Sequence, residues 1–302
     1  MIYTLTLNPS LDYYLGVDYL ESDRIIRANN SYLTFGGKGI NVSAVLTMLG
    51  VENTALGIAA GFSGKELLNK LEKENIKSDF FYSDDGATRI NVKIKCDSEY
   101  DINAAGAPIN NDLISKLLVR INTIKSDDML IISGSLPSDC PKDLYSRIAS
   151  ELFKKGVKII ADTTGKVLLD LLKYKPFLIK PNTDELGELF GVKITSSDDV
   201  ISYAKRLQGM GALNVLVSRG KDGAVLLTEK GEVKEIGVYN SEIVSTTGCG
   251  DSMLAGFVAG YNDKNDFDYA LKLGSACAAA TAFSECLCNI EKIKHYLDFF
   301  DR

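Results

Sequence analysis

Histidine and tryptophan are nearly missing from this chain. Among its 302 residues there is one histidine, His295, and no tryptophan. A single histidine excludes Ser-His-Asp and Cys-His catalytic centres built within one chain, unless His295 is itself the base. Acid–base chemistry is therefore expected among the carboxylates, lysines and tyrosines.

Paired cysteines, long apolar runs and an excess of positive charge are also lacking. The six cysteines form no CxxC pair, and with no signal-like start they are expected to be reduced thiols in a cytoplasm. With one histidine, no zinc site is predicted. No apolar run approaches the ~20 residues of a membrane span, so no membrane partner is expected. The formal net charge of −6 disfavours nucleic acid, although a few convergent cations can still bind a small anion.

Short apolar runs alternate with amphipathic helical patterns along most of the chain. The runs typical of buried strands are Ile2 to Leu7, Met129 to Ile132, Val157 to Ala161, Phe177 to Ile179 and Val215 to Val217. The expected helix starts are Ser63 with Glu66, Pro141, Asn182 with Glu185, and Ser197. This alternation predicts an α/β fold with a mainly parallel sheet that helices cover on both faces.

Two segments, at about 12–35 and 88–105, interrupt the alternation. Thr88 to Lys95 alternates polar and apolar residues, which is typical of a strand with one wet face. We predict a small antiparallel sheet that forms a lid on a single domain spanning 1–302. Its apolar residues Ile90, Val92 and Ile94 would be covered if two lids paired in a homodimer.

The first candidate site is the glycine-rich run Gly36-Gly37-Lys38-Gly39-Ile40-Asn41-Val42. Glycines let backbone N–H groups approach a ligand, and the helix expected to follow favours an anion at its N-terminus. Lys38 adds a positive charge. The alternative interpretation is a tight turn with a solvated lysine. The P-loop pattern GxxxxGK[ST] does not occur in the chain.

The second candidate site is Ser245-Thr246-Thr247-Gly248-Cys249-Gly250-Asp251-Ser252, which precedes a helix of small residues. Gly248 to Gly250 would offer backbone donors beside the Asp251 carboxylate. Asp251 then has two interpretations: a base that takes a proton from an attacking hydroxyl, or a plain helix N-cap. The residues alone leave both open.

Together the two runs resemble a known family. GGKGINV at 36–42 and TTGCGDSMLAGF at 246–257 are similar to the two signature motifs of the ribokinase-like, pfkB-type carbohydrate kinases. The resemblance implies a Rossmann-like three-layer α/β sandwich with a small β-sheet lid. It also implies transfer of the ATP γ-phosphoryl group to a sugar hydroxyl, with Asp251 as base, Gly248, Cys249 and Gly250 as backbone donors, and Mg²⁺ arriving with ATP. Cys249 stands where the family usually has alanine, and Ser245 where the general signature has aspartate.

Further stretches resemble the branch of fructose-1-phosphate and tagatose-6-phosphate kinases. They are TLNPSLD at 6–12, TRINVK at 88–93 and SGSLP at 133–137. We therefore expect phosphorylation of fructose 1-phosphate to fructose 1,6-bisphosphate, with tagatose 6-phosphate as the alternative acceptor. A kinase of nucleosides or unphosphorylated sugars and a non-catalytic sugar-phosphate sensor are more remote alternatives.

The resemblance also implies roles for individual residues. Asp12 and Asn41 would bind sugar hydroxyls, and Lys38 and Arg89 the substrate phosphate. The full substrate set is Asp12, Gly36, Gly37, Lys38, Asn41, Arg89 and Ser135, with Arg27 and Asn103 as weaker candidates. The nucleotide set is Lys180, Asn182, Ser218, Arg219, Gly220, Gly223 and Ser284.

Overall fold

Buried apolar strands form the centre of the fold. The computed structural model describes residues 1–239 and 241–300, and within them nine strands form one sheet in the order β13-β12-β11-β10-β9-β8-β1-β4-β5. These strands are β1 Ile2–Thr6, β4 Asn53–Ala60, β5 Ser78–Ser83, β8 Met129–Ser133, β9 Lys158–Asp162, β10 Leu178–Ile179, β11 Asn214–Ser218, β12 Ala224–Leu227 and β13 Val233–Ile236. All neighbours from β5 to β11 pair in parallel, and only β12, which pairs with β11 and β13 near one edge, runs antiparallel to its neighbours. The predicted mainly parallel sheet and its five predicted strands are confirmed, with strand ends that differ by one residue.

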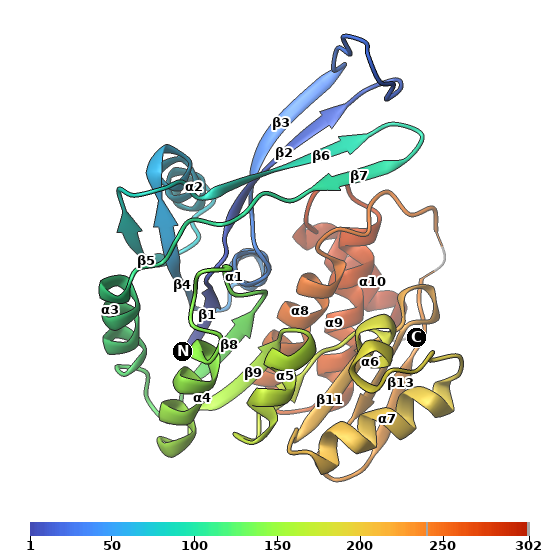
Figure 1. The fold of residues 1–302 in the computed structure, drawn as a ribbon. Coiled ribbons are helices and arrows are strands. Elements are labelled where there is room, and N and C mark those ends of the chain that lie inside the picture. The colour runs from blue at the N-terminus through green and yellow to red at the C-terminus, as the bar shows by residue number, and fades with distance from the viewer. Residues whose placement is uncertain (240, 301–302) are drawn as a thin grey trace.

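Helices cover both faces of this sheet, which gives three layers (Figure 1). One face carries α1 Lys38–Met48, α2 Gly61–Lys73, α8 Cys249–Lys264, α9 Phe267–Ala282 and α10 Ile290–Phe300. The other carries α3 Asn111–Ile121, α4 Leu144–Lys154, α5 Gly165–Leu172, α6 Thr183–Phe190 and α7 Ser197–Gly209. Because each face buries its own apolar cluster, the strands are apolar on both sides, as their sequences indicate.

Two of the predicted helix starts are confirmed. Asn182 and Glu185 form a reciprocal capping box at the N-terminus of α6. Helix α7 begins at Ser197, and Ser196 caps it in the same way with Asp199. These caps satisfy backbone donors that a helix N-terminus otherwise leaves unpaired.

Two other predicted starts are wrong. Helix α2 already begins at Gly61, and the hydroxyl of Ser63 donates to the carbonyl of Thr88 at 2.6 Å instead of capping the helix. Helix α4 begins at Leu144 rather than at Pro141. In the first case a contact with a distant strand replaces the local cap that the sequence suggests.

A second, four-stranded sheet projects from the C-terminal edge of the main sheet (Figure 1). We call it the small sheet; its order is β3-β2-β6-β7, with β2 Ser10–Gly16, β3 Asn30–Gly36, β6 Arg89–Lys95 and β7 Glu99–Ile102. The β2·β3 and β6·β7 pairs are antiparallel, but the central β2·β6 pair is parallel. The expectation of a wholly antiparallel sheet is therefore wrong, because β2 and β6 both leave the main body in the same direction.

The polar face of the small sheet faces the body of the protein rather than solvent. On β6, Asn91 is buried, and Lys95 Nζ donates to the carbonyl of Val244, in the segment before α8, at 3.3 Å. The apolar face packs near the body against α2, where Leu11 is buried with Leu67. Among residues 1–239 and 241–300, no helix combines the length and apolar character needed to cross a membrane.

Candidate active site

The N-termini of α1 and α8 meet at the C-terminal edge of the main sheet. Asn41, in the first turn of α1, donates from Nδ2 to Oδ2 of Asp251, in the first turn of α8, at 2.8 Å. This contact joins the two glycine-rich motifs, which lie 210 residues apart in the chain. Unpaired N–H groups and the helix dipole favour negative charge at both helix ends.

Asp251 is a buried carboxylate with a perturbed acidity. Its side chain is 7% exposed. Burial, reinforced by the negative charge of Asp162, raises the pKa of Asp251 to about 6, against the opposing effects of Asn41, Lys38 and Lys180. A carboxylate with this pKa is largely ionised at neutral pH and still accepts a proton readily, as a general base must. The N-cap interpretation is wrong, because Gly248 occupies the N-cap position of α8.

The backbone of the α8 N-terminus supplies donors next to Asp251. Of the three predicted donor residues, Cys249 already gives its N–H to the carbonyl of Thr246 at 3.4 Å. In the described part of the chain, the N–H groups of Gly250 and Asp251 have no protein acceptor. These two groups can therefore point their hydrogens at an anion.

Two lysines share one buried carboxylate beside this helix end. Asp162, at the end of β9, is 1% exposed, and its Oδ1 lies 3.3 Å from Lys180 Nζ and 3.7 Å from Lys38 Nζ. Lys38 Nζ also lies 3.9 Å from Oε1 of Glu185. The Asp162 charge raises the pKa of Lys38, which outweighs the opposing effect of burial. A Cβ built on Gly250 would lie 3.2 Å from Lys180 Nζ, which places this ammonium against the first turn of α8.

Sequence reasoning missed Asp162 and assigned Glu185 only a capping role. The available signal was an aspartate directly after the predicted strand that ends at Ala161, because carboxyl ends of parallel strands line the ligand-binding edge of such sheets. A strand-end aspartate is also common in turns, so its burial between two lysines cannot be read from the local sequence.

A second group of predicted residues lies on and beside the small sheet. Asp12 Oδ1 accepts hydrogen bonds from Ser10 Oγ and from Asn91 Nδ2, each at 2.8 Å. Arg89 Nη2 donates to the carbonyl of Asn8 at 3.1 Å, and Arg89 Nε has no partner among the described residues. Burial lowers the pKa of Arg89 against the opposing charge of Asp12, and the guanidinium stays protonated at neutral pH.

The other residues predicted to bind the sugar phosphate lie either beside this group or at the exposed end of the small sheet. Ser135 follows β8, and its Oγ accepts from Asn8 Nδ2 at 3.3 Å. Gly36 ends β3 and precedes Gly37 at the start of α1. Arg27 and Asn103 are exposed, and the contacts of the described residues connect neither to Asp12 nor to Asp251.

One cavity extends from Asp12 on the small sheet to Asn41 and Gly248 near the two helix ends. It has a volume of about 610 Å³ and lies between the small sheet, α1, the N-terminus of α8 and the segment 285–287. Asp12, Asn41 and Gly248 are among its lining residues. A ligand held there can contact the small sheet and the α8 N-terminus at the same time.

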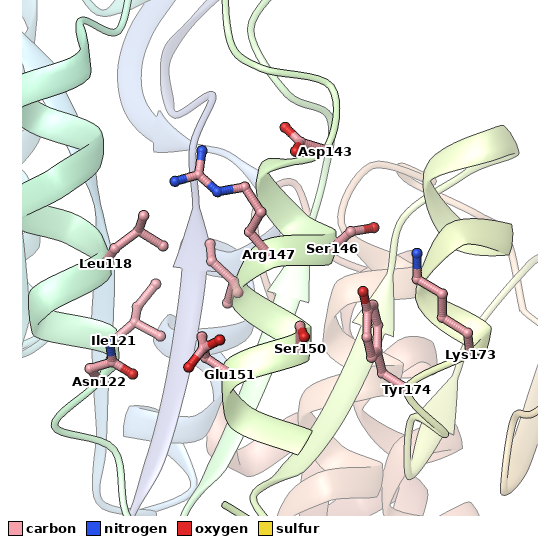
Figure 2. Close-up of a pocket in the computed structure, with 11 residues that line it drawn as sticks. Leu118, Ile121, Asn122, Asp143, Ser146, Arg147, Ser150, Glu151, Lys173 and Tyr174 are labelled. Atoms are coloured by element: carbon pink, nitrogen blue, oxygen red, sulfur yellow. The ribbon is translucent and has the colours of Figure 1, made fainter. Parts of the chain in front are cut away.

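Figure 2 shows a second cavity, of about 440 Å³, with side chains from α3, α4 and the end of α5. Tyr174, one of its lining residues, precedes β10, so this cavity lies toward the opposite edge of the main sheet from Asp251. Its lining residues, all from the described part of the chain, include none of the predicted site residues. It is therefore separate from the candidate active site.

Most of the predicted nucleotide residues form one wall at the ends of β10 and β11. Asn182 and Ser218 pair as an isolated parallel bridge. Arg219 Nη2 donates to the carbonyl of Asp222 at 2.7 Å and lies 3.3 Å from Oε2 of Glu235. The turn Gly220–Asp222 and Gly223 then lead into β12.

Ser284 lies apart from that wall, just beyond the C-terminus of α9. Its hydroxyl donates to the carbonyl of Ala280 at 2.7 Å and accepts from Lys292 Nζ at 2.8 Å. These contacts close the end of α9. Lys180, in contrast, belongs to the group around Asp162 described above.

Comparison with known proteins agrees with this geometry. The model of the pfkB family carbohydrate kinases matches residues 7–292. The chain is 38% identical to a 1-phosphofructokinase of Bacillus subtilis, covering 98% of this chain and 97% of that protein. It is 37% identical to a D-tagatose-1-phosphate kinase of Bacillus licheniformis, covering 97% and 96% respectively.

Solved structures show the same fold. The phosphofructokinase-2 of Escherichia coli in complex with substrates and products superposes with a TM-score of 0.95 at 29% identity, covering 100% of this chain and 99% of that one. A ribokinase of Arabidopsis thaliana complexed with ribose and ATP superposes with a TM-score of 0.80 at 18% identity, covering 99% and 98%. The fold is thus ribokinase-like, and the chain belongs to the pfkB family of carbohydrate kinases.

Proposed function

We propose that this chain is a 1-phosphofructokinase, which transfers the γ-phosphoryl group of ATP to the 6-hydroxyl of fructose 1-phosphate. The products are fructose 1,6-bisphosphate and ADP. One observation carries the chemistry: the buried Asp251 carboxylate, with a pKa raised to about 6, lies in the first turn of α8 and accepts from Asn41, which lines the same cavity as Asp12. The relatives named 1-phosphofructokinase support the choice of acceptor.

Asp251 acts as the base in the transfer step. It takes the proton of the 6-hydroxyl while that oxygen forms a bond to the γ-phosphorus. The bond from the γ-phosphorus to the oxygen of the β-phosphate breaks, and ADP leaves with that electron pair. The N–H groups of Gly250 and Asp251, together with the α8 dipole, stabilise the charge of the moving group.

The two lysines around Asp162 supply positive charge to the same group. Phosphoryl transfer depends chiefly on positioning and on neutralising negative charge. Lys180 lies against Gly250, and Lys38 is held by Asp162 and Glu185. We therefore assign Lys38 to the phosphoryl group in transit rather than to the substrate phosphate, and leave the substrate 1-phosphate to Arg89.

The residues around Asp162 also fit a magnesium ion that arrives with ATP. Asp162 Oδ2 is buried without a hydrogen-bond partner in the described part of the chain, and the Glu185 carboxylate lies close to the same lysine. Mg²⁺ usually binds through one or two carboxylates together with substrate phosphates. Residues 1–239 and 241–300 contain no cluster of three or more metal-ligating side chains. When bound, the ion neutralises phosphate charge.

The nucleotide itself is assigned to the wall at the ends of β10 and β11. Asn182, Ser218 and the turn from Arg219 to Gly223 offer amide, hydroxyl and backbone groups there. Ser284 stays a predicted nucleotide contact, although it lies beyond the C-terminus of α9, where its hydroxyl accepts from Lys292 Nζ.

A tagatose phosphate is the alternative acceptor. The sequence suggested tagatose 6-phosphate, whereas the relatives are named D-tagatose-1-phosphate kinase. Tagatose and fructose differ in the configuration of one hydroxyl, and a site with a polar partner for that hydroxyl can discriminate steeply. The 1-phosphate isomers leave the same terminal hydroxyl for Asp251, so both acceptors suit one mechanism.

A homodimer through the small sheet is the assembly we propose. On its apolar face Tyr13, Val92 and Ile102 lie in register across β2, β6 and β7, and Tyr13 and Ile102 are exposed. A second copy of the same face would cover them, as the sequence pattern suggested. Sedimentation velocity measures the oligomeric state directly.

A substrate panel tests the proposed function. ATP consumption is measured with fructose 1-phosphate, fructose 6-phosphate, the 1- and 6-phosphates of tagatose, fructose and adenosine. The highest kcat/KM is expected with fructose 1-phosphate, and activity should fall at least ~10²-fold in Asp251→Asn protein purified in parallel. A clear preference for a tagatose phosphate would overturn the acceptor and leave the reaction type standing. Ligand binding without turnover would instead indicate a sugar-phosphate sensor.

A further inference from the structure

Asn91, on β6, is a buried polar residue of the small sheet with no role in the mechanism above. Its side chain is 3% exposed. In the parallel pairing of β2 with β6 it lies directly opposite Asp12, the carboxylate expected to bind sugar hydroxyls. A buried amide must satisfy its hydrogen bonds within the protein, so its partners indicate what it does.

Both ends of the Asn91 amide have a defined partner. Nδ2 donates to Oδ1 of Asp12 at 2.8 Å, and Oδ1 accepts from the backbone N–H of Ala104 at 3.2 Å. A backbone N–H can only donate, so it selects the oxygen of the amide and turns the NH₂ group toward Asp12. Residue 91 therefore has to present one acceptor and one donor, in fixed positions.

The two oxygens of Asp12 are used differently. Oδ1 accepts from Ser10 Oγ at 2.8 Å as well as from Asn91. Oδ2 has no hydrogen-bond partner among the described residues, and a Cβ built on Gly36 would come within 2.5 Å of it. Since Asp12 lines the 610 Å³ cavity, Oδ1 holds the side chain in place and Oδ2 remains available to a ligand.

The same amide links Asp12 to the segment that follows β7. Ala104 belongs to that segment, and Gly106, two residues later, lies against Asn8, where a Cβ would approach Oδ1 of Asn8 to 2.3 Å. Asn8 in turn contacts Arg89 and Ser135. Fixing Asn91 therefore fixes Asp12 relative to the group expected to bind the substrate phosphate.

We propose that Asn91 is a positioning residue for the sugar acceptor, which holds Oδ1 of Asp12 so that Oδ2 faces the sugar hydroxyls. This inference rests on the proposed function, because it takes the sugar phosphate to bind at Asp12. It adds a specificity element that acts through Asp12 and leaves the nucleotide side of the site untouched.

Asn91→Asp tests this role with almost no change of shape. The variant replaces the donor by a second carboxylate beside Asp12, and at pH 8 the two negative charges repel. We expect the KM for fructose 1-phosphate to rise at least about tenfold at pH 8, with the KM for ATP within about twofold of wild type. Toward pH 6 one carboxyl of the pair takes up a proton and restores the hydrogen bond, so the KM ratio of variant to wild type should fall.

The KM of Asn91→Asp is divided by that of wild type at each pH, because other titratable groups face the same region. They are Arg89, Lys93 and Lys95 on β6, Tyr14 on β2, Tyr32 on β3, Glu99 and Asp101 on β7, Glu285 and Cys286 across the cavity, and Asp251, which accepts from Asn41. All of them are present in both proteins, so the ratio isolates the change at position 91. A variant that merely loosened the sheet would show no recovery at lower pH.

Asn29→Asp is the matched control. Asn29 Nδ2 donates to Oδ1 of Asp18 at 2.7 Å at the exposed end of the small sheet, so the same charge is added beside another aspartate. Its KM for fructose 1-phosphate should stay within about twofold of wild type at every pH. If Asn91→Asp does not fold, as judged by circular dichroism, Asn91→Ser removes the amide donor and should raise the same KM without recovery at low pH.

Besides a KM ratio of Asn91→Asp that does not recover at lower pH, three results overturn the inference. The first is an unchanged KM for the sugar phosphate in Asn91→Asp or Asn91→Ser protein when the wild type is active. This result refutes only the positioning role of Asn91 and does not affect the proposed function. Equal increases in both KM values refute that role in the same way. A wild type that phosphorylates no sugar phosphate of the panel overturns the proposed function and this inference together; if it prefers another sugar phosphate, the KM ratio is measured with that one.

Discussion

Replacing the carboxylate of Asp251, the proposed base, by its amide should make the protein more stable as it removes activity. The pKa of Asp251 is raised from its ordinary value of 3.8 to about 6, chiefly by burial. The folded protein therefore resists ionising this group, and above about pH 6 it carries the charge at a cost to its stability. One pKa unit corresponds to 1.36 kcal/mol, so a shift of about two units sets the gain from Asp251→Asn at up to about 3 kcal/mol.

The pH dependence gives the sign of this effect. Below about pH 4 Asp251 is protonated in both the folded and the unfolded protein, so wild type and variant should be equally stable. Between about pH 4 and pH 6 the folded state binds the extra proton, and the wild type loses stability relative to the variant as pH rises. At pH 7.5 the difference is complete. In a chain of this size it corresponds to a rise in Tm of roughly 5 °C or more.

Thermal unfolding followed by circular dichroism at pH 4 and pH 7.5 measures the difference. Asp266→Asn is the control, because it removes the same charge from the N-cap of the neighbouring helix α9, where backbone N–H groups lower the pKa of Asp266. That variant should show no gain in Tm. An Asp251→Asn protein no more stable than wild type at pH 7.5, or equally stabilised at pH 4, would refute the electrostatic account of the site.

Three further predictions concern activity. In the wild type kcat/KM, which follows the pKa of the free enzyme, should fall about tenfold from pH 7 to pH 5 as Asp251 gains its proton. Asp251→Asn should lower kcat at least ~10²-fold with little change in KM, and a flat pH profile of the wild type would exclude Asp251 as the base. Arg89→Ala should weaken sugar-phosphate binding by about 2–3 kcal/mol, measured as KM, with the KM for ATP unchanged; equal weakening of both substrates would show a structural role. Burial and the Asp251 charge raise the pKa of Cys249 to about 12, so the thiol is neutral. Cys249→Ala should therefore keep kcat within about twofold of wild type. If iodoacetamide at pH 7 rapidly inactivates the wild type but not this variant, the Cys249 thiol is reactive and the prediction is wrong.

The sequence predicts the architecture well where local pattern decides the structure. Val157 to Ala161 is apolar throughout, which suits a strand buried on both faces, and it forms β9 one residue further along. The capping residues Asn182 and Glu185 act within one turn of chain, so their pattern identifies the start of α6. The resemblance to a family assigns both glycine-rich motifs to one site, and the structure adds a direct contact between Asn41 and Asp251 there.

What the sequence does not predict depends on contacts between distant segments. The alternation of residues 88–95 predicts the two faces of a strand. It does not predict that β6 pairs in parallel with β2, because that pairing depends on the direction in which both strands leave the main body. Lys38 has the same charge wherever it points, and only the fold places it between Asp162 and Glu185. Asn91 has no local signal either, since an asparagine in an alternating strand is usually an exposed polar residue.

In the proposed function, the small sheet carries residues that select the acceptor, and the main body carries those that transfer the phosphoryl group. Asp12, Arg89 and Asn91 lie on β2 and β6, whereas Asp251 and Lys180 belong to the main body. Substitutions in β2 and β6 can therefore exchange one sugar for another while the groups that move the phosphoryl stay in place. We therefore expect a directed-evolution library confined to those two strands to yield variants with new sugar acceptors and with the transfer step retained.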